Sequence, residues 1–148
     1  MKRILLPFLF IALIATATAA AEVTYSQQIK PLFEARCNAC HGQDAPEYKV
    51  FKQEKDAWTT KGVGPRMDSY TYLVSFTGWP DTGALMRRLD DGASREDKKP
   101  GNMYQHLGDN DSERQQNLAL FKAWVGNWTL KRFDALTKDD LAGIKVPY

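Results

Sequence analysis

The strongest constraint in this sequence lies at residues 37–41, where Cys37 and Cys40, the chain's two cysteines, are followed directly by His41. This is the C-x-x-C-H pattern of covalent haem attachment. Each thiol can form a thioether with one vinyl group of the same porphyrin edge, and the adjacent imidazole can turn onto the iron from one face. The segment therefore predicts one haem c, with His41 as an iron ligand.

Two other uses of paired cysteines are less consistent with the sequence. A thioredoxin-like redox disulfide needs strands that alternate with helices around a buried sheet, and the chain has no run of alternating β-branched residues. A structural zinc site takes four ligands, and His106 is the one further Cys or His in the chain. Both alternatives are therefore disfavoured.

The N-terminus has the pattern of a secretory signal. A positive start at Lys2 and Arg3 precedes an apolar run over residues 4–14 and then small residues suited to cleavage. The apolar run is shorter than the roughly 20 residues that cross a bilayer. We expect a signal peptide over residues 1–21 and one mature domain over residues 22–148 that does not span a membrane.

The charge balance excludes several partners. The chain has 20 Lys and Arg against 18 Asp and Glu, and the loss of Lys2 and Arg3 with the signal leaves 18 of each. A nucleic-acid binder needs a basic surplus to neutralise phosphates, as does a polybasic membrane-surface module. The signal type and haem attachment after export indicate the periplasm of a Gram-negative bacterium.

Helical spacing of apolar residues predicts an all-α fold. The longer helices are expected over residues 27–40, 69–76, 82–90 and 112–125. A last short helix is expected to begin with a capping box formed by Thr137 and Asp140. Residues 42–66 and 90–102 are polar and rich in Gly and Pro, so we expect loops there.

Polar residues at the expected helix starts are candidate N-caps, because their side chains can accept hydrogen bonds from first-turn amides. They are Ser26, Asp68 or Ser69, Asp81 or Thr82, and Ser112, which forms an S-x-x-Q capping box with Gln115. Pro31 lies in the first helix and is expected to kink it or delay its start. Gly126 is expected to end the long helix in a left-handed conformation.

Residues 25–42 resemble the N-terminal helix and haem-binding segment of monohaem class I cytochromes c. Residues 62–67 are similar to that family's Gly-Pro-x-Leu segment, with Met67 where Leu is usual. Residues 100–103 resemble its Pro-Gly-x-x-Met segment, one residue shorter here. The resemblance covers most of residues 25–128. It implies a class I cytochrome c-like helical fold around one covalently bound haem, with extended loops.

The resemblance also implies how the iron is held. His41 is the proximal ligand, and its second ring nitrogen bonds to the carbonyl of Pro65. Proline suits this task because its fixed φ makes the carbonyl stiff. The same Pro-Gly-x-x-Met segment presents Met103 as the distal ligand.

The residues themselves leave four candidates for the distal position, which are Met67, Met86, Met103 and His106. Met86 lies in an apolar helical stripe, where methionine usually fills the core. Met67 is two residues beyond Pro65, which leaves little chain to reach the opposite haem face. Met103 follows a Pro-Gly turn in a loop and is favoured, and His106 in the same loop is the alternative.

An iron with both axial positions filled by the protein exchanges electrons and reacts poorly with peroxide or carbon monoxide. We therefore predict a monomeric electron carrier, not an enzyme, that docks transiently on redox partner proteins. The alternatives are a peroxidase-like haem subunit and a haem-based sensor with a displaceable sixth ligand. Polar loops at residues 53–56 and 94–99 predict a wet haem edge and a potential below that of the mitochondrial type.

Overall fold

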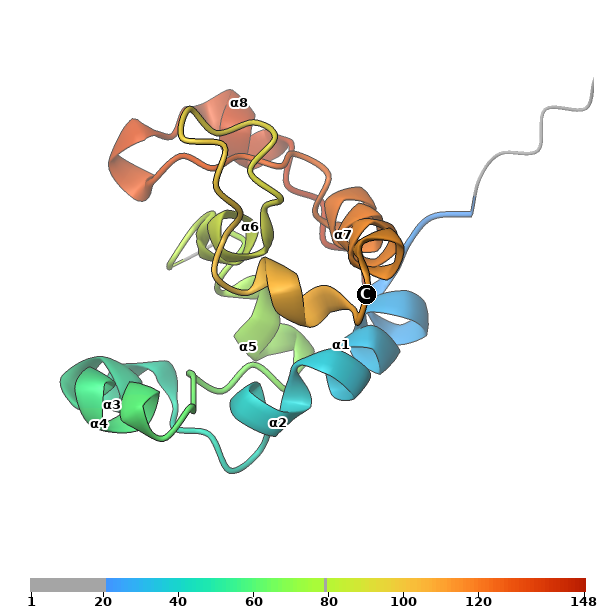
Figure 1. The fold of residues 1–148 in the computed structure, drawn as a ribbon. Coiled ribbons are helices and arrows are strands. Elements are labelled where there is room, and N and C mark those ends of the chain that lie inside the picture. Colours follow the sequence, from blue (N-terminus) through green and yellow to red (C-terminus); the bar gives the residue numbers. More distant parts are fainter. Residues whose placement is uncertain (1–20, 79) are drawn as a thin grey trace, which may run out of the picture.

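The computed structural model describes residues 21–78 and 80–148 (Figure 1). The helical elements in these ranges are η1 (Tyr25–Ile29), α1 (Lys30–Arg36), α2 (Asn38–His41), α3 (Tyr48–Gln53), α4 (Lys55–Thr60), α5 (Tyr70–Val74), α6 (Ala84–Leu89), η2 (Tyr104–Leu107), α7 (Asp111–Val125), η3 (Phe133–Ala135) and α8 (Lys138–Ala142). The β contact within the described ranges is an isolated bridge between Gly126 and Ile144. The predicted all-α fold is confirmed. No helix in these ranges combines the length and apolar character that a membrane span requires. The proposed signal lies outside the described residues except for its last position.

The expected N-terminal helix is divided into three parts. It begins with a π-helical turn, η1, which is capped by Thr24 and not by Ser26, since Thr24 Oγ1 accepts from the amide of Gln27 at 3.4 Å. Pro31 lies in the first turn of α1, directly after η1, so its missing N–H removes one backbone hydrogen bond where the π-helical turn changes to α-helix. Regular α-helix thus starts at Lys30, the delay predicted from Pro31.

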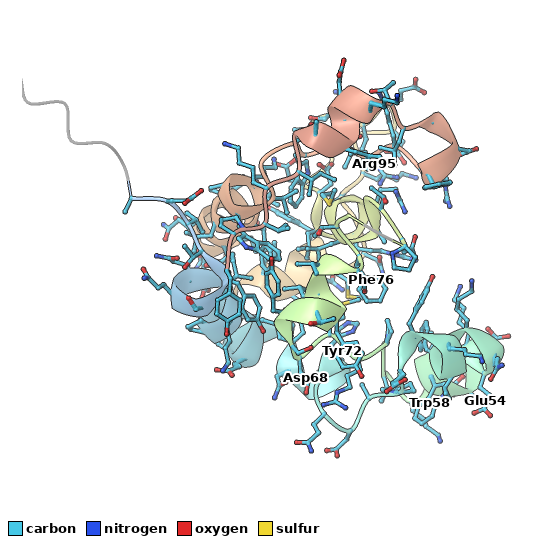
Figure 2. The ribbon with its side chains drawn as sticks, turned by 180° about the vertical axis from the view of Figure 1, so that it is seen from behind. Glu54, Trp58, Asp68, Tyr72, Phe76 and Arg95 are labelled. Carbon is cyan, nitrogen blue, oxygen red and sulfur yellow. The ribbon has the colours of Figure 1, made fainter. Side chains whose placement is uncertain are left out.

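The loop expected over residues 42–66 contains two short helices, α3 and α4, so this prediction was wrong. Figure 2 shows Glu54 and Trp58 on this pair, set apart from Tyr72 and Phe76. The spacing of apolar residues did not predict these helices because neither of them buries an apolar face. No residue of α3 or α4 is buried, and Val50 is 42% exposed. Residues 53–56 are exposed. The reduction potential below that of the mitochondrial type, which was inferred in part from these polar residues, stays a prediction.

Tyr48 fastens the α3–α4 pair to the rest of the molecule. Its hydroxyl donates to Asp81 at 2.6 Å, and its ring meets Phe76 edge-on with centroids 5.1 Å apart. Burial raises the pKa of Tyr48 to about 12, and the hydrogen bond to Asp81 acts in the same direction. The phenol therefore stays a donor at neutral pH, which keeps this contact intact.

Two helix starts differ from the prediction. The N-cap of α6 is Gly83, whose φ of 74° is left-handed, because the expected cap Asp81 is engaged with Tyr48. Thr82 is not the cap either. The N-cap of α7 is Asn110 and not Ser112, so this helix begins earlier than its apolar stripe suggested.

Other helix ends match the prediction. Ser69 caps α5 by accepting from the amide of Tyr72, and Thr137 forms the predicted capping box of α8 with Asp140. Gly126 ends α7 where predicted and has a positive φ of 80°, although its ψ of −96° lies outside the left-handed helical region that was expected. These ends were predictable because each depends on residues within one turn of the boundary.

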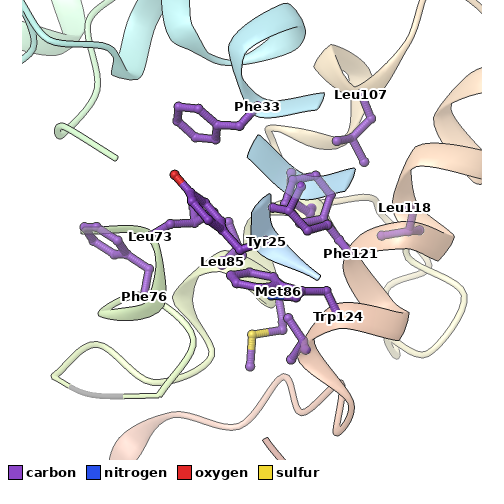
Figure 3. Close-up of a cluster of buried hydrophobic side chains, with 13 residues drawn as sticks. Tyr25, Phe33, Leu73, Phe76, Leu85, Met86, Leu107, Leu118, Phe121 and Trp124 are labelled. Carbon is purple, nitrogen blue, oxygen red and sulfur yellow. The ribbon is translucent and has the colours of Figure 1, made fainter. Parts of the chain in front are cut away.

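The hydrophobic core lies where η1, α1, α5, α6 and α7 meet (Figure 3). Its buried side chains are Tyr25, Ile29, Phe33, Leu73, Phe76, Leu85, Met86, Leu89, Leu107, Leu118, Phe121, Trp124 and Val125. Burial of one large apolar side chain contributes roughly 1.5–3 kcal/mol. Packing in this cluster therefore holds η1, α1, α5, α6 and α7 in fixed relative positions.

The C-terminal tail closes the molecule against its N-terminal helix (Figure 1). The carbonyl of Pro147 accepts from the amide of Tyr25 at 2.9 Å and from Trp124 Nε1 at 2.8 Å. The amide of Ser26 donates to Tyr148 O at 2.9 Å. The two ends of the described chain therefore lie together, away from the α3–α4 pair.

The position of the α7 cap can be tested by substitution. Asn110 Oδ1 accepts from the amide of Glu113 at 2.9 Å, whereas Ser112 contacts only an exposed glutamine side chain. We expect Asn110→Ala to lower the free energy of unfolding by about 1 kcal/mol, and Ser112→Ala to change it by less than about 0.5 kcal/mol. Denaturant unfolding of the two variants measures this. A larger loss in Ser112→Ala would contradict the observed cap.

Candidate functional site

The junction of α1 and α2 carries the attachment motif. Cys37 ends α1, donating its amide to Phe33 O at 2.8 Å, and its own carbonyl accepts from the amide of His41 at 3.0 Å. Both cysteines have free thiols, with Cys37 partly buried and Cys40 exposed. The spacing i, i+3, i+4 keeps the two thiols and the imidazole close along one stretch of helical backbone.

The imidazole of His41 is oriented by one hydrogen bond. Its Nδ1 lies 2.7 Å from the carbonyl oxygen of Pro65. A carbonyl can only accept, so Nδ1 donates and the lone pair is left on Nε2. That tautomer binds a metal, and the hydrogen bond also fixes the plane of the ring. The contact implied by the resemblance is therefore present.

The segment around Pro65 lies directly on the imidazole. The amide of Gly64 donates to Cys40 O and the amide of Met67 donates to His41 O, each at 2.9 Å. A Cβ atom at position 64 would lie 2.1 Å from Cε1 of His41, so no side chain fits there. Gly64 is thus a site residue that sequence reasoning missed. Gly64 lies in the predicted Gly-Pro-x-Leu-like segment, but a glycine before proline is equally typical of an ordinary turn, so its contact with the imidazole was not expected.

Burial dominates the ionisation of the motif. It lowers the pKa of His41, and the charge on His106 acts in the same direction, against the opposing effect of the hydrogen bond to Pro65. Burial raises the pKa of Cys37 to about 11. A neutral imidazole has its lone pair free for a metal. A thiol with a raised pKa differs from a redox-active C-x-x-C cysteine, whose pKa is lowered.

Two of the four distal candidates, Met86 and Met67, are placed unfavourably for a face opposite His41. Met86 is fully buried within the hydrophobic core (Figure 3). Met67 is tied by its amide to the carbonyl of His41, on the proximal side. His106 is exposed, with Nε2 3.3 Å from Gln105 Nε2.

Met103 has a different environment. It directly precedes η2, is partly buried and packs against the core. Its amide donates to Arg88 O at 2.9 Å, in the last turn of α6. Met103 thus has a fixed backbone and a side chain at the margin of the core, and its role as a ligand stays a prediction.

The residues present fit a haem. His41 offers a lone pair on a fixed ring, and the paired thiols lie beside it. Trp58 Nε1 and Thr82 Oγ1 are buried without a hydrogen-bond partner among the described residues. Within the described ranges, no three His, Cys, Asp or Glu side chains cluster as a metal site, which zinc would require.

The chain matches the family described as PccH Cytochrome c over residues 24–148. It belongs to that family. The solved structure of the monoheme cytochrome PccH from Geobacter sulfurreducens is 60% identical to this cytochrome, with a TM-score of 0.81. The match covers 86% of this chain and 100% of that chain. A comparison with curated proteins gave no match.

Family membership confirms several sequence predictions. The protein is a monohaem cytochrome c with one haem c and its iron, and its fold is that of the family. This also makes it a haem-based electron-transfer protein at the level of the family. We infer the iron ligands, the compartment and the partner proteins from the residues of the chain.

Gly64 offers a direct test of the proximal geometry. Gly64→Ala places a Cβ against Cε1 of His41 and should force the ring from Pro65. Loss of that hydrogen bond makes the imidazole a weaker donor to ferric iron, so the reduction potential should rise. Gly78→Ala is the control, since the nearest atom to its Cβ is Val74 O at 3.9 Å. Equal midpoints for the two variants and the native protein in redox titrations would rule out this role.

Proposed function

We propose that this cytochrome is a periplasmic carrier of single electrons between transiently docked partner proteins. Cys37 and Cys40 hold the porphyrin through thioethers, and His41 and Met103 are the axial ligands of the iron. The haem, when bound, supplies a reversible one-electron change at its iron. The chain's own residues bind the haem, orient the ligands and limit the access of water.

The observation that carries the proposal is the hydrogen bond from His41 Nδ1 to Pro65 O. It selects the tautomer with Nε2 free, and the absence of a side chain at Gly64 lets the backbone lie against the ring. An imidazole restrained by both of these contacts changes little in position when the charge of a bound iron changes. Such restraint suits electron transfer, which makes and breaks no bond at the site.

Met103 supports a carrier over the alternative functions. A peroxidase or a ligand-displacement sensor needs an open or displaceable sixth position. Here the amide of Met103 is held by Arg88 O, and that of Gly101, two residues earlier, by Asp90 O. A ligand attached to backbone that is fixed at two points is suited to permanent coordination.

Export is part of the proposal and rests on the sequence. Residues 1–21 have the charge, apolar run and small residues of a cleaved signal, and covalent haem attachment follows export. Partner proteins then lie in the same compartment. The balanced charge of the mature chain fits partners of either sign and favours no nucleic acid.

The identity of the distal ligand is tested by substitution. Met103→Ala should abolish the sulfur-to-iron charge-transfer band at the red end of the ferric spectrum and let the ferrous form bind carbon monoxide. Met67→Leu and Met86→Leu are matched controls that remove the other thioethers of the mature chain at similar volume. Survival of the band in Met103→Ala would assign the ligand elsewhere.

Export and haem loading are tested by the intact mass of the protein from a Gram-negative host. We expect the periplasmic fraction to contain one species, cleaved after Ala19 or Ala21 and carrying one covalent haem. Retention of residues 1–21, or haem-loaded protein found only in the cytoplasm, would refute this part of the proposal.

A further inference from the structure

Asp90 is a fully buried carboxylate that the motif analysis did not single out. Its Oδ1 accepts from the amide of Gly92 at 2.8 Å, and its Oδ2 accepts from Trp128 Nε1 at 3.0 Å. These partners are neutral donors. A buried charge is costly unless its oxygens are satisfied, so each of these hydrogen bonds is needed.

The backbone of the same residue joins two other parts of the chain. The amide of Asp90 donates to Met86 O at 2.9 Å at the end of α6, and its carbonyl accepts from the amide of Gly101 at 2.7 Å. Residues 91–100 therefore leave the core and return to it at one point. We call the contact between Asp90 and Gly101 the loop base.

The loop base leads directly to Met103. A Cβ on Gly101 would lie 2.3 Å from Arg88 O, so the returning chain touches the last turn of α6. The amide of Met103 then donates to that same carbonyl at 2.9 Å. Arg88 Nη1 also donates to Asn102 Oδ1 at 2.8 Å. Residues 101–103 therefore lie along the last turn of α6.

We propose that Asp90 is the positioning residue of the distal side of the haem. Its carboxylate, anchored on Trp128 beyond the end of α7, holds the loop base from which Met103 is presented. The inference rests on the proposed role of Met103 as a ligand. The carboxylate is required because both of its oxygens accept, whereas an amide at this position turns one donor toward a donor partner.

Three variants of the holoprotein separate this role from general stability. Asp90→Asn leaves either Trp128 Nε1 or the amide of Gly92 without an acceptor. Trp128→Phe removes the donor to Asp90 Oδ2 and keeps a large apolar ring. It tests the same hydrogen bond if Asp90→Asn does not fold. Asp97→Asn is the matched control, because Asp97 also accepts from a loop amide, Lys99 at 3.1 Å, and its other partner, Arg95, lies within the same loop.

The first readout is amide hydrogen exchange in the native state. In Asp90→Asn and Trp128→Phe, exchange at Gly101 and Met103 should speed up on the order of tenfold, as for the loss of one hydrogen bond to a charged group. The amides of Gly64 and Met67, on the proximal side, should keep their native rates. Unchanged rates at Gly101 and Met103, or an equal rise at all four amides, would overturn the proposal.

The second readout is binding of free imidazole to the ferric protein, in competition with the distal ligand. Asp90→Asn and Trp128→Phe should bind imidazole about tenfold more tightly than the native protein, while Asp97→Asn should match it. Native affinity in the first two variants would overturn the positioning role. If Met103→Ala itself has native imidazole affinity, the assignment of Met103 fails instead, and this outcome is distinct from loss of the loop base.

Discussion

The hydrogen bond between His41 Nδ1 and Pro65 O is the interaction on which the site depends. It decides which ring nitrogen is free, and it does so through a carbonyl whose backbone proline stiffens. Gly64 makes the approach possible, since any side chain there would overlap the ring. Hydrogen bonds therefore join α2 to the segment at residues 62–67 around the imidazole.

We propose that the distal side of the haem is built by different means. No single short segment contains all of its parts: α6 supplies the carbonyl of Arg88, the chain beyond α7 supplies Trp128, and Asp90 joins them. Long-range contacts of this kind form only once the helices pack on the shared core. A covalently anchored proximal side and a distal side held by tertiary contacts explain why the first is a compact motif and the second is spread over the sequence.

The sequence predicted the parts of this protein that depend on local chemistry. The spacing of Cys37, Cys40 and His41 specified the cofactor, and the capping residues Ser69 and Thr137 lie where expected. The helices α3 and α4 were missed because they bury no apolar face, and the N-cap of α6 was misplaced because Asp81 bonds to Tyr48 from a distant segment. Gly64 was missed for a similar reason, since its contact with the imidazole is visible only in three dimensions.

The central claim is that the iron lies between His41 and Met103. Its most direct test is the NMR spectrum of the ferrous cytochrome labelled with ¹³C at its methionine methyl groups. A methyl held above the porphyrin plane is shifted strongly upfield by the ring current. We predict one such resonance, and we assign it to Met103 by its loss in Met103→Leu. A spectrum with no shifted methyl, or a shifted methyl that belongs to Met67 or Met86, would contradict the account.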